Sequence, residues 1–355
     1  MSEARWQALW LRNSLRRGGM ARLLWPVSLV YGALMALRRG LYQMGLKQSH
    51  SVGVPVVVIG NVVVGGAGKT PTVIGVVNHL KTQGWQPGVV SRGHGRQSQH
   101  VVLVHADTAL ADSGDEPALI HRRTQVPVCV AAQRVAAARA LLAAHPEVNI
   151  LVCDDGLQHL ALHRDVQIIV FDERGTGNGW LLPAGLLREP WPRETKTSAS
   201  DLVLHQRRDD TPNPALIRAP GVPVFGAVRR LADHAVGPTG EQMSLDQLRG
   251  QRVTAVAGTA RPGVFFDMLR ARGIEPAAEV GLPDHATLPD YAALMQDSSI
   301  TLLCTEKDAV KLFPTLIDSP ADQRPQVWAV PLELTPDPAF FNALDGRLER
   351  LKSRA

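Results

Sequence analysis

The chain has 355 residues, 45% of them hydrophobic and 20% charged, which suffices for a full core and more than one domain. Its net charge of +5 is uneven, because residues 1–50 carry seven Arg and one Lys against a single acid. With only 5% aromatic residues, this excludes a nucleic-acid groove across the whole protein. The three cysteines lie in apolar runs without metal-ligand spacing, which indicates core residues in a reducing cytosol.

The first 50 residues predict a membrane-docking helical segment. After Pro26, apolar residues recur at near-helical spacing up to Leu41, with arginines and aromatic residues around them. The longest uncharged run, residues 23–37, is shorter than the roughly 20 apolar residues that span a bilayer. We therefore expect a helix lying in the headgroup layer of an anionic membrane. The alternative is an ordinary amphipathic helix packed on the domain.

Residues 54–71 predict a nucleotide-phosphate loop, because an apolar strand leads directly into a glycine-rich turn closed by a lysine and a threonine. Such a loop directs backbone N–H groups at phosphate oxygens, the lysine reaches the β and γ phosphates, and the threonine hydroxyl ligates Mg²⁺. The predicted nucleotide-binding residues are Val63, Val64, Gly65, Gly66, Ala67, Gly68, Lys69 and Thr70. Val63 stands where the usual motif has glycine, so we expect Gly65 and Gly66 to supply the bend.

Strand-like runs then alternate with helical patterns, which predicts an α/β fold with a mostly parallel sheet, like that of P-loop NTPases. A second, smaller α/β series begins near Arg252, after a segment rich in Pro and Gly at residues 212–240. We expect an N-terminal amphipathic helical segment at 1–50, a P-loop core domain at 51–228, and a smaller C-terminal α/β domain at 229–355.

Several acids follow predicted strands or precede predicted helices. Asp154 and Asp155 end an apolar strand, as the second acidic element of a nucleotide–Mg²⁺ site does, although two turn acids before a glycine are the simpler alternative. Asp115 has two interpretations, an ordinary helix N-cap or a general base in phosphoryl transfer. His285 reads by itself as a polar loop residue, and residues 305–308 read as another helix cap.

The chain resembles the tetraacyldisaccharide 4′-kinases, the lipid A kinases of Gram-negative bacteria, over nearly its whole length. The resemblance rests on seven motifs in the same order: Gly60-Asn61 with residues 64–71, residues 91–96, 114–117, 154–159, 177–190, Asp284-His285, and 305–308. It implies that ATP donates its γ-phosphoryl to the 4′-hydroxyl of an acylated glucosamine disaccharide 1-phosphate. It also implies a peripheral protein, with Mg²⁺, on the cytoplasmic face of the inner membrane, and we expect a monomer.

The same resemblance assigns roles to individual residues. Lys69 and Thr70 belong to the phosphate loop, and Thr70, Asp154 and Asp155 to the Mg²⁺ site. Asp115 and His285 act together as the general base and bridge the two domains. The histidine orients the carboxylate or shares its proton. Substrate or phosphate contacts are assigned to Glu116, Arg92, Arg134, His159 and Arg188. The chain departs from the family pattern at His94, Leu186 and Ala286, where tyrosine, proline and a second histidine are expected.

A different class remains as the alternative, a membrane-associated P-loop ATPase that acts as a positioning or assembly switch. Those proteins carry a lysine immediately before the glycine pair, where this chain has Val64, so dimerisation-activated hydrolysis is disfavoured. A GTP-driven carrier would need an Asn-Lys-x-Asp element, and residues 305–308 lack the leading Asn.

Overall fold

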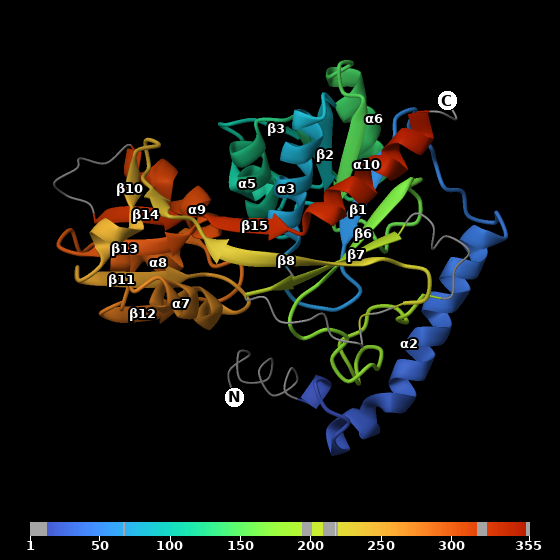
Figure 1. Cartoon of the computed structure of the whole chain (residues 1–355), viewed down its shortest axis with the longest axis horizontal. Helices are drawn as coiled ribbons and strands as arrows, with labels where there is room; N and C mark the ends of the chain where they lie inside the picture. Colours follow the sequence, from blue (N-terminus) through green and yellow to red (C-terminus); the bar gives the residue numbers. More distant parts are fainter. Residues whose placement is uncertain are drawn as a thin grey trace.

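The structure, a computed structural model, describes residues 13–66, 68–193, 201–208, 217, 219–317 and 325–352. These residues form two α/β units lying side by side, one around a nine-stranded sheet and the other around a six-stranded sheet (Figure 1). Parallel strands with helices between them dominate both units, so the predicted fold class is confirmed.

The larger sheet has the strand order β15-β8-β7-β6-β1-β5-β2-β4-β3. Its seven inner strands run parallel, and the edge strands β3 and β15 run antiparallel to their neighbours. The strands are β1 (Val56–Gly60), β2 (Pro87–Ser91), β3 (Val102–Val104), β4 (Val128–Val130), β5 (Ile150–Asp154), β6 (Val166–Phe171), β7 (Asp201–Arg207), β8 (Val224–Leu231) and β15 (Leu332–Pro336).

Helices cover both faces of this sheet because successive strand residues point to opposite sides. Val57 and Ile59 pack in one apolar cluster with α3 (Lys69–Thr82), α5 (Asp115–Thr124) and α10 (Pro338–Lys352). Val56 and Val58 face the other side and pack with α6 (Arg134–Ala144) and with the loop residues Leu157, Leu186 and Leu187. A short helix, α4 (Leu110–Ser113), precedes α5. The central strands are thus buried on both faces, and only their ends are available to a ligand.

The smaller sheet has the order β10-β9-β14-β13-β11-β12, in which the last four strands run parallel. Its strands are β9 (His234–Val236), β10 (Gln242–Ser244), β11 (Val253–Ala257), β12 (Ala278–Gly281), β13 (Thr301–Thr305) and β14 (Gln326–Val330). Its helices are η3 (Leu245–Leu248), α7 (Pro262–Ala271), α8 (Leu288–Met295) and α9 (Glu306–Ile317). Two apolar clusters cover its two faces.

The two units exchange chain, which corrects the predicted boundary. β8 leaves the larger sheet toward the smaller one, and β15 returns to pair with β8 before α10 packs on the larger unit (Figure 1). Residues 229–355 are therefore not one domain, since β15 and α10 complete the larger unit. The expected connection at 212–240 also contains the strand β8, whose Val-Phe-Gly-Ala-Val core outweighs the Pro and Gly around it.

The N-terminal helix α2 (Gly19–Gln43) lies along the outside of the larger unit (Figure 1). It begins seven residues before Pro26, which lies inside it, because the early apolar residues extend the helical pattern backwards. The expectation that this segment is too short to span a bilayer is wrong, since α2 has 25 residues and is long and apolar enough to do so by length and composition.

Candidate functional site

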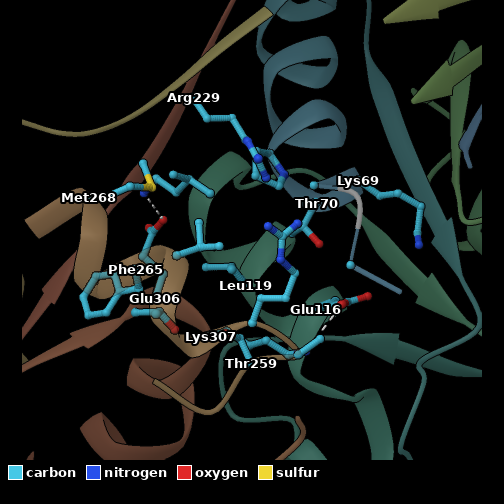
Figure 2. Close-up of a pocket in the computed structure, with 18 of the residues that line it drawn as sticks. Lys69, Thr70, Glu116, Leu119, Arg229, Thr259, Phe265, Met268, Glu306 and Lys307 are labelled. Carbon is cyan, nitrogen blue, oxygen red and sulfur yellow. Dashed lines mark hydrogen bonds and ion pairs between the residues drawn. The ribbon is translucent and has the colours of Figure 1, made fainter. Parts of the chain in front are cut away.

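A cavity of about 240 Å³ opens between the two units and contains the predicted phosphate loop (Figure 2). Its polar wall comes from the larger unit, with Lys69, Thr70 and Glu116. The smaller unit supplies Phe265 and Met268 of α7, together with Thr259, Glu306 and Lys307, as Figure 2 shows. The larger unit therefore gives the cavity a charged wall at a helix N-terminus, whereas the smaller unit adds an apolar half around Phe265 and Met268 that is bordered by the charged Glu306 and Lys307.

The phosphate loop joins the end of β1 to the start of α3. Gly68 has a φ of +72°, and a Cβ there would collide with Oε1 of Gln206. The Gln206 amide nitrogen donates to Gly68 O at 2.7 Å and to Thr72 Oγ1 at 2.6 Å, so β7 supports the loop from below. Only glycine satisfies both the backbone angle and the close approach. Ala67 lies outside the described residues.

The first predicted residues of the loop do not reach the cavity, which corrects the predicted extent of the site. Val63 is fully buried and forms a β-bridge with Leu187, and the Val64 N–H donates to Leu186 O at 2.9 Å. Arg174 donates to Val64 O at 3.1 Å. Because Val63 is buried and the backbone groups of Val64 are already bonded, these two residues anchor the loop, and the residues lining the cavity begin at Gly66.

The paired acids lie at the carboxyl end of β5, next to the loop. Asp154 Oδ2 accepts a hydrogen bond from Ser91 Oγ at 3.1 Å, while the buried Oδ1 has no partner among the described residues. Burial, with the nearby Glu116 and Asp155 carboxylates, raises the pKa of Asp154 to about 7. Asp155 Oδ1 lies 3.5 Å from Lys69 Nζ. Burial opposes ionisation of Asp155, but the Lys69 and Arg188 charges outweigh it and lower its pKa.

These groups fit a magnesium site. In the described part of the chain no three His, Cys, Asp or Glu side chains converge as a metal cage. Mg²⁺ does not need one, because it is held by one or two carboxylates with waters and substrate phosphates. A buried carboxylate oxygen without a partner, beside a second acid and a threonine at a helix start, suits that arrangement.

Asp115 and His285 meet across the cleft. His285 Nδ1 lies 3.3 Å from Asp115 Oδ2, and Lys311 Nζ lies 2.8 Å from the same oxygen. The N-cap of α5 is Gly114, and no side chain caps it, so the helix-cap interpretation of Asp115 does not describe this residue. Burial raises the pKa of Asp115, but the hydrogen bonds from His285 and Lys311 outweigh burial and lower it. The carboxylate is therefore held ionised at neutral pH.

The surroundings of His285 also come from both units. Its φ of +61° is rare for a residue with a side chain, and its ring lies 4.8 Å from that of His94 in the larger unit. Next to it, Lys307 Nζ donates to Asp284 Oδ1 at 2.9 Å and lies 3.6 Å from Glu116 Oε1. Glu116 thus points into the cleft and is paired across it.

Arg134 and His159 support the site from behind rather than lining it. The Arg134 N–H, at the start of α6, donates to His159 Nε2 at 3.0 Å. Burial and the Arg134 charge lower the pKa of His159 to about 4, so the ring accepts as a neutral base. The buried Arg134 guanidinium donates to Asp155 O at 3.5 Å, which steadies the turn carrying that acid. Arg92 is exposed and has no hydrogen bond or ion pair among the described residues.

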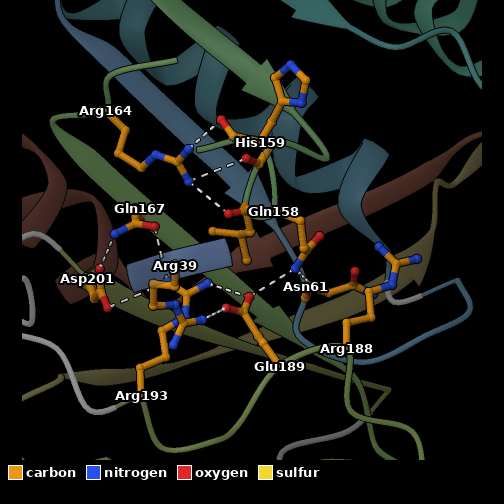
Figure 3. A network of polar contacts seen from close by, with 12 residues as sticks. Arg39, Asn61, Gln158, His159, Arg164, Gln167, Arg188, Glu189, Arg193 and Asp201 are labelled. Carbon is orange, nitrogen blue, oxygen red and sulfur yellow. Dashed lines mark hydrogen bonds and ion pairs between the residues drawn. The ribbon is translucent and has the colours of Figure 1, made fainter. Parts of the chain in front are cut away.

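Arg188 reaches the site from a loop that α2 braces. Its guanidinium lies 3.5 Å from Asp155 Oδ1, and its backbone O accepts from Tyr31 Oη of α2 at 2.8 Å. Arg39 of α2 pairs with the neighbouring Glu189 at 2.6 Å, within the polar network of Figure 3. These contacts occupy one side of α2. Large apolar side chains elsewhere on α2 are more than half exposed, namely Leu23, Val27, Leu29, Val30, Leu34 and Leu37.

Other residues of the site are absent from the sequence interpretation. Lys311 sits in an apolar helical pattern, and Gln206 in an apolar strand, so no local motif marks either of them. Arg261 crosses from the smaller unit to Glu173 at 2.7 Å and to the buried Asp172 at 3.4 Å. The one signal that the sequence offers is a charged residue, such as Lys311, at a position of a helix that should be buried. A buried charge predicts that the residue is paired with an opposite charge.

Comparison with known proteins gives one consistent answer. The sequence profile of a family described as tetraacyldisaccharide-1-P 4′-kinase matches residues 20–349. The tetraacyldisaccharide 4′-kinase of Acidovorax ebreus is 52% identical over 95% of this chain and 93% of its own. That of Polaromonas sp. JS666 is 51% identical over 97% of both chains. The crystal structure titled as the "apo" form of LpxK from Aquifex aeolicus in complex with ATP has a TM-score of 0.77 and 26% identity, over 93% of this chain and 99% of its own.

Proposed function

Because the chain belongs to the tetraacyldisaccharide-1-P 4′-kinase family, we propose that its inter-unit cleft moves the γ-phosphoryl of ATP to the 4′-hydroxyl of a tetraacyldisaccharide 1-phosphate. The protein is thus an ATP-dependent lipid kinase of lipid A biosynthesis. One observation carries the assignment to this cleft: the phosphate loop and the Asp115–His285 pair open into the same space from opposite units.

The charged wall of the cavity binds the triphosphate. Gly66, Gly68 and the start of α3 present backbone N–H groups and the positive end of a helix dipole to the phosphates. Lys69 exchanges its Asp155 contact for phosphate oxygens, and Arg188 lies 3.5 Å from the same oxygen of that acid. The apolar half, with Phe265 and Met268, suits the base of the nucleotide.

Thr70, Asp154 and Asp155 are the residues that would hold Mg²⁺, which when bound neutralises charge on the β and γ phosphates. Asp154 is suited to this because its free buried oxygen gains a partner there. The Lys69 ammonium and the Arg188 guanidinium hold Asp155 ionised, so that the pair carries negative charge at neutral pH.

Asp115 acts as the general base on the acceptor. Its Oδ2 is occupied by His285 and Lys311, so Oδ1 is left to accept the proton of the 4′-hydroxyl. The 4′-oxygen then bonds to the γ-phosphorus, the bond to the β–γ bridging oxygen breaks, and ADP leaves with that electron pair. His285 orients the carboxylate and relays its proton to solvent, which requires the two units to be together.

Membrane attachment through α2 brings the lipid acceptor close to the cleft. The exposed apolar side chains of α2 enter the anionic inner-membrane surface on its cytoplasmic side, while Tyr31 and Arg39 keep the helix joined to the catalytic unit. Arg188, on the loop that α2 braces, stands between the lipid surface and the triphosphate. A lipid acceptor reaches the cleft along this side.

The test is incubation of the protein with Mg²⁺-ATP and the acylated disaccharide 1-phosphate, followed by mass spectrometry of the lipid. The expected product carries one added phosphate at the 4′-position. Release of ADP without a phosphorylated lipid would contradict the proposal and favour the ATPase-switch alternative.

A further inference from the structure

Lys311 is a buried cation that the phosphate chemistry does not use. It lies on α9 of the smaller unit, and only 7% of its surface is exposed. Its Nζ lies 2.8 Å from Asp115 Oδ2, on α5 of the larger unit, and no other carboxylate in the described ranges lies within 4 Å of it. A buried ammonium needs a counter-charge. This one finds it across the cleft, on the carboxylate assigned as the base.

The same ammonium is bonded to the segment that carries the histidine. Lys311 Nζ donates to Ala286 O at 2.7 Å, and Ala286 directly follows His285, whose φ is +61°. A left-handed conformation at a residue with a side chain persists only where its surroundings fix it. One side chain therefore holds both partners of the Asp115–His285 contact, the carboxylate directly and the histidine through the next carbonyl.

The acid nearest to Lys311 along α9, Asp308, is engaged in other hydrogen bonds. Asp308, one turn earlier, is fully buried, and its Oδ1 accepts from Tyr291 Oη at 2.6 Å and from Gly258 N at 2.9 Å. Its Oδ2 accepts from Thr305 Oγ1 at 2.7 Å. Both carboxylate oxygens of Asp308 therefore accept hydrogen bonds within the smaller unit, and Lys311 forms its ion pair with Asp115 instead.

We propose that Lys311 is a positioning residue for the phosphoryl transfer, which fixes Asp115 against His285 and keeps the base ionised when the two units are together. The inference rests on the proposed role of Asp115. Because the contact joins α9 to α5, the base acquires its working state only in the closed cleft. An open cleft leaves the Lys311 ammonium with the Ala286 carbonyl but without a counter-charge.

The cation has a predictable effect on pH dependence. The titratable groups around Asp115 are Lys307 and Lys311 on α9, His285 with His94 stacked on its ring, Tyr291 on α8, and Glu116 beside it. An opposite charge within 4 to 6 Å lowers a carboxyl pKa by about 1 to 3 units. Loss of the Lys311 charge therefore moves the acid limb of kcat to higher pH by about that amount.

The experiment compares pH profiles of kcat for the wild type, Lys311→Met, Lys311→Arg, Asp115→Asn and the Lys311→Met/Asp115→Asn double variant. We expect Lys311→Met to lower kcat at pH 7 by about 10- to 100-fold, with the KM for ATP unchanged and the acid limb moved up. Lys311→Arg keeps the positive charge, so the acid limb of its kcat profile should stay at the wild-type pH. The double variant is no slower than Asp115→Asn alone, since Lys311 acts through that carboxylate.

The matched control is Lys81→Met. Lys81 is an exposed lysine on α3 whose ammonium donates to Thr124 O at 2.8 Å and has no carboxylate partner among the residues that the structure describes, so its loss leaves the acid limb of kcat in place. A wild-type limb in Lys311→Met, or a double variant slower than Asp115→Asn by the full single effect, overturns the inference. Full activity of Asp115→Asn removes the base itself, which is a separate failure of the proposed function.

Discussion

The two units of this molecule contribute to opposite halves of one reaction, and they do so differently. The larger unit supplies Lys69 and Thr70 at the start of α3 and Asp154 and Asp155 at the end of β5, and their mutual contacts lie within that unit. The smaller unit supplies His285 and Lys311, whose polar contacts reach Asp115 in the other unit. The residues proposed to hold phosphate and metal therefore all come from one unit, whereas those proposed to handle the proton come from both.

The largest predicted effect concerns the larger unit alone. Lys69→Ala should lower kcat by about 10³- to 10⁵-fold, since it removes a cation from the transferring phosphoryl group. Phosphorylated lipid is measured by mass, and folding by circular dichroism. Lys81→Ala on the same helix is the matched control. Near-normal turnover in a folded Lys69→Ala protein would remove the loop from the mechanism.

Asp115→Asn tests whether proton transfer can be lost while nucleotide binding is kept. It should lower kcat by about 10²- to 10⁴-fold, the usual range for loss of a general base, with unchanged ATP affinity. Nucleotide affinity is measured by isothermal titration calorimetry on the intact chain. If ATP affinity fell together with kcat, proton and phosphate handling would not be divided as the geometry indicates.

His285→Gln should cost less, about 10- to 100-fold, because the histidine orients the base and solvent can still take the proton. The loss should grow toward acid pH, because without the hydrogen bond from His285 the pKa of Asp115 rises. The measurement is kcat against pH. A variant as slow as Asp115→Asn at every pH would make the histidine, rather than the carboxylate, the reacting base.

The same division explains what the sequence could predict. The phosphate loop and the acid pair follow strands directly, so strand-then-loop patterns predicted their positions and their proximity to the correct edge of the sheet. Val63 and Val64 were assigned to the cavity because a motif carries no information on tertiary hydrogen bonds. Here Leu186 O accepts from the Val64 N–H, and Val63 is buried in a β-bridge opposite Leu187.

Contacts between residues far apart in the chain could not be predicted from local sequence patterns. No local motif marks Lys311 on α9, and its partner lies nearly 200 positions earlier in the chain. The return of β15 to β8 is likewise set by pairing across both units, so the C-terminal boundary was misplaced. The contact of Asp115 with His285 came from family resemblance, and no spacing rule could have supplied it.

Membrane attachment should depend on the exposed side of α2 and not on the cleft. Val30→Glu with Leu34→Glu, at side chains 62% and 60% exposed, should weaken binding to anionic vesicles at least about tenfold, since each residue loses apolar burial in the lipid. Vesicle flotation measures this. Leu288→Glu, on an exposed leucine of the smaller unit, is the matched control and should leave flotation intact. Unchanged flotation of the double variant would assign another surface to the membrane.

The smallest effect contrasts two histidines, one in each unit. His159 has a folded pKa of about 4, below the ordinary 6.5, because it is buried and lies near the Arg134 charge. The unfolded chain therefore binds more protons between these values, so this contribution to stability is complete above pH 6.5 and is lost as pH falls toward 4.

His159→Gln keeps an acceptor but cannot titrate. Between pH 7 and pH 5 the wild type should lose about 1 kcal/mol more unfolding free energy than the variant, measured by urea denaturation. Turnover at pH 8 should fall less than in His285→Gln, because His159 caps α6 and its partner is a backbone N–H rather than the base. Equal acid sensitivity in wild type and variant would mean that His159 is charged in the folded protein. The turn carrying Asp155 would then be held by something other than a neutral ring.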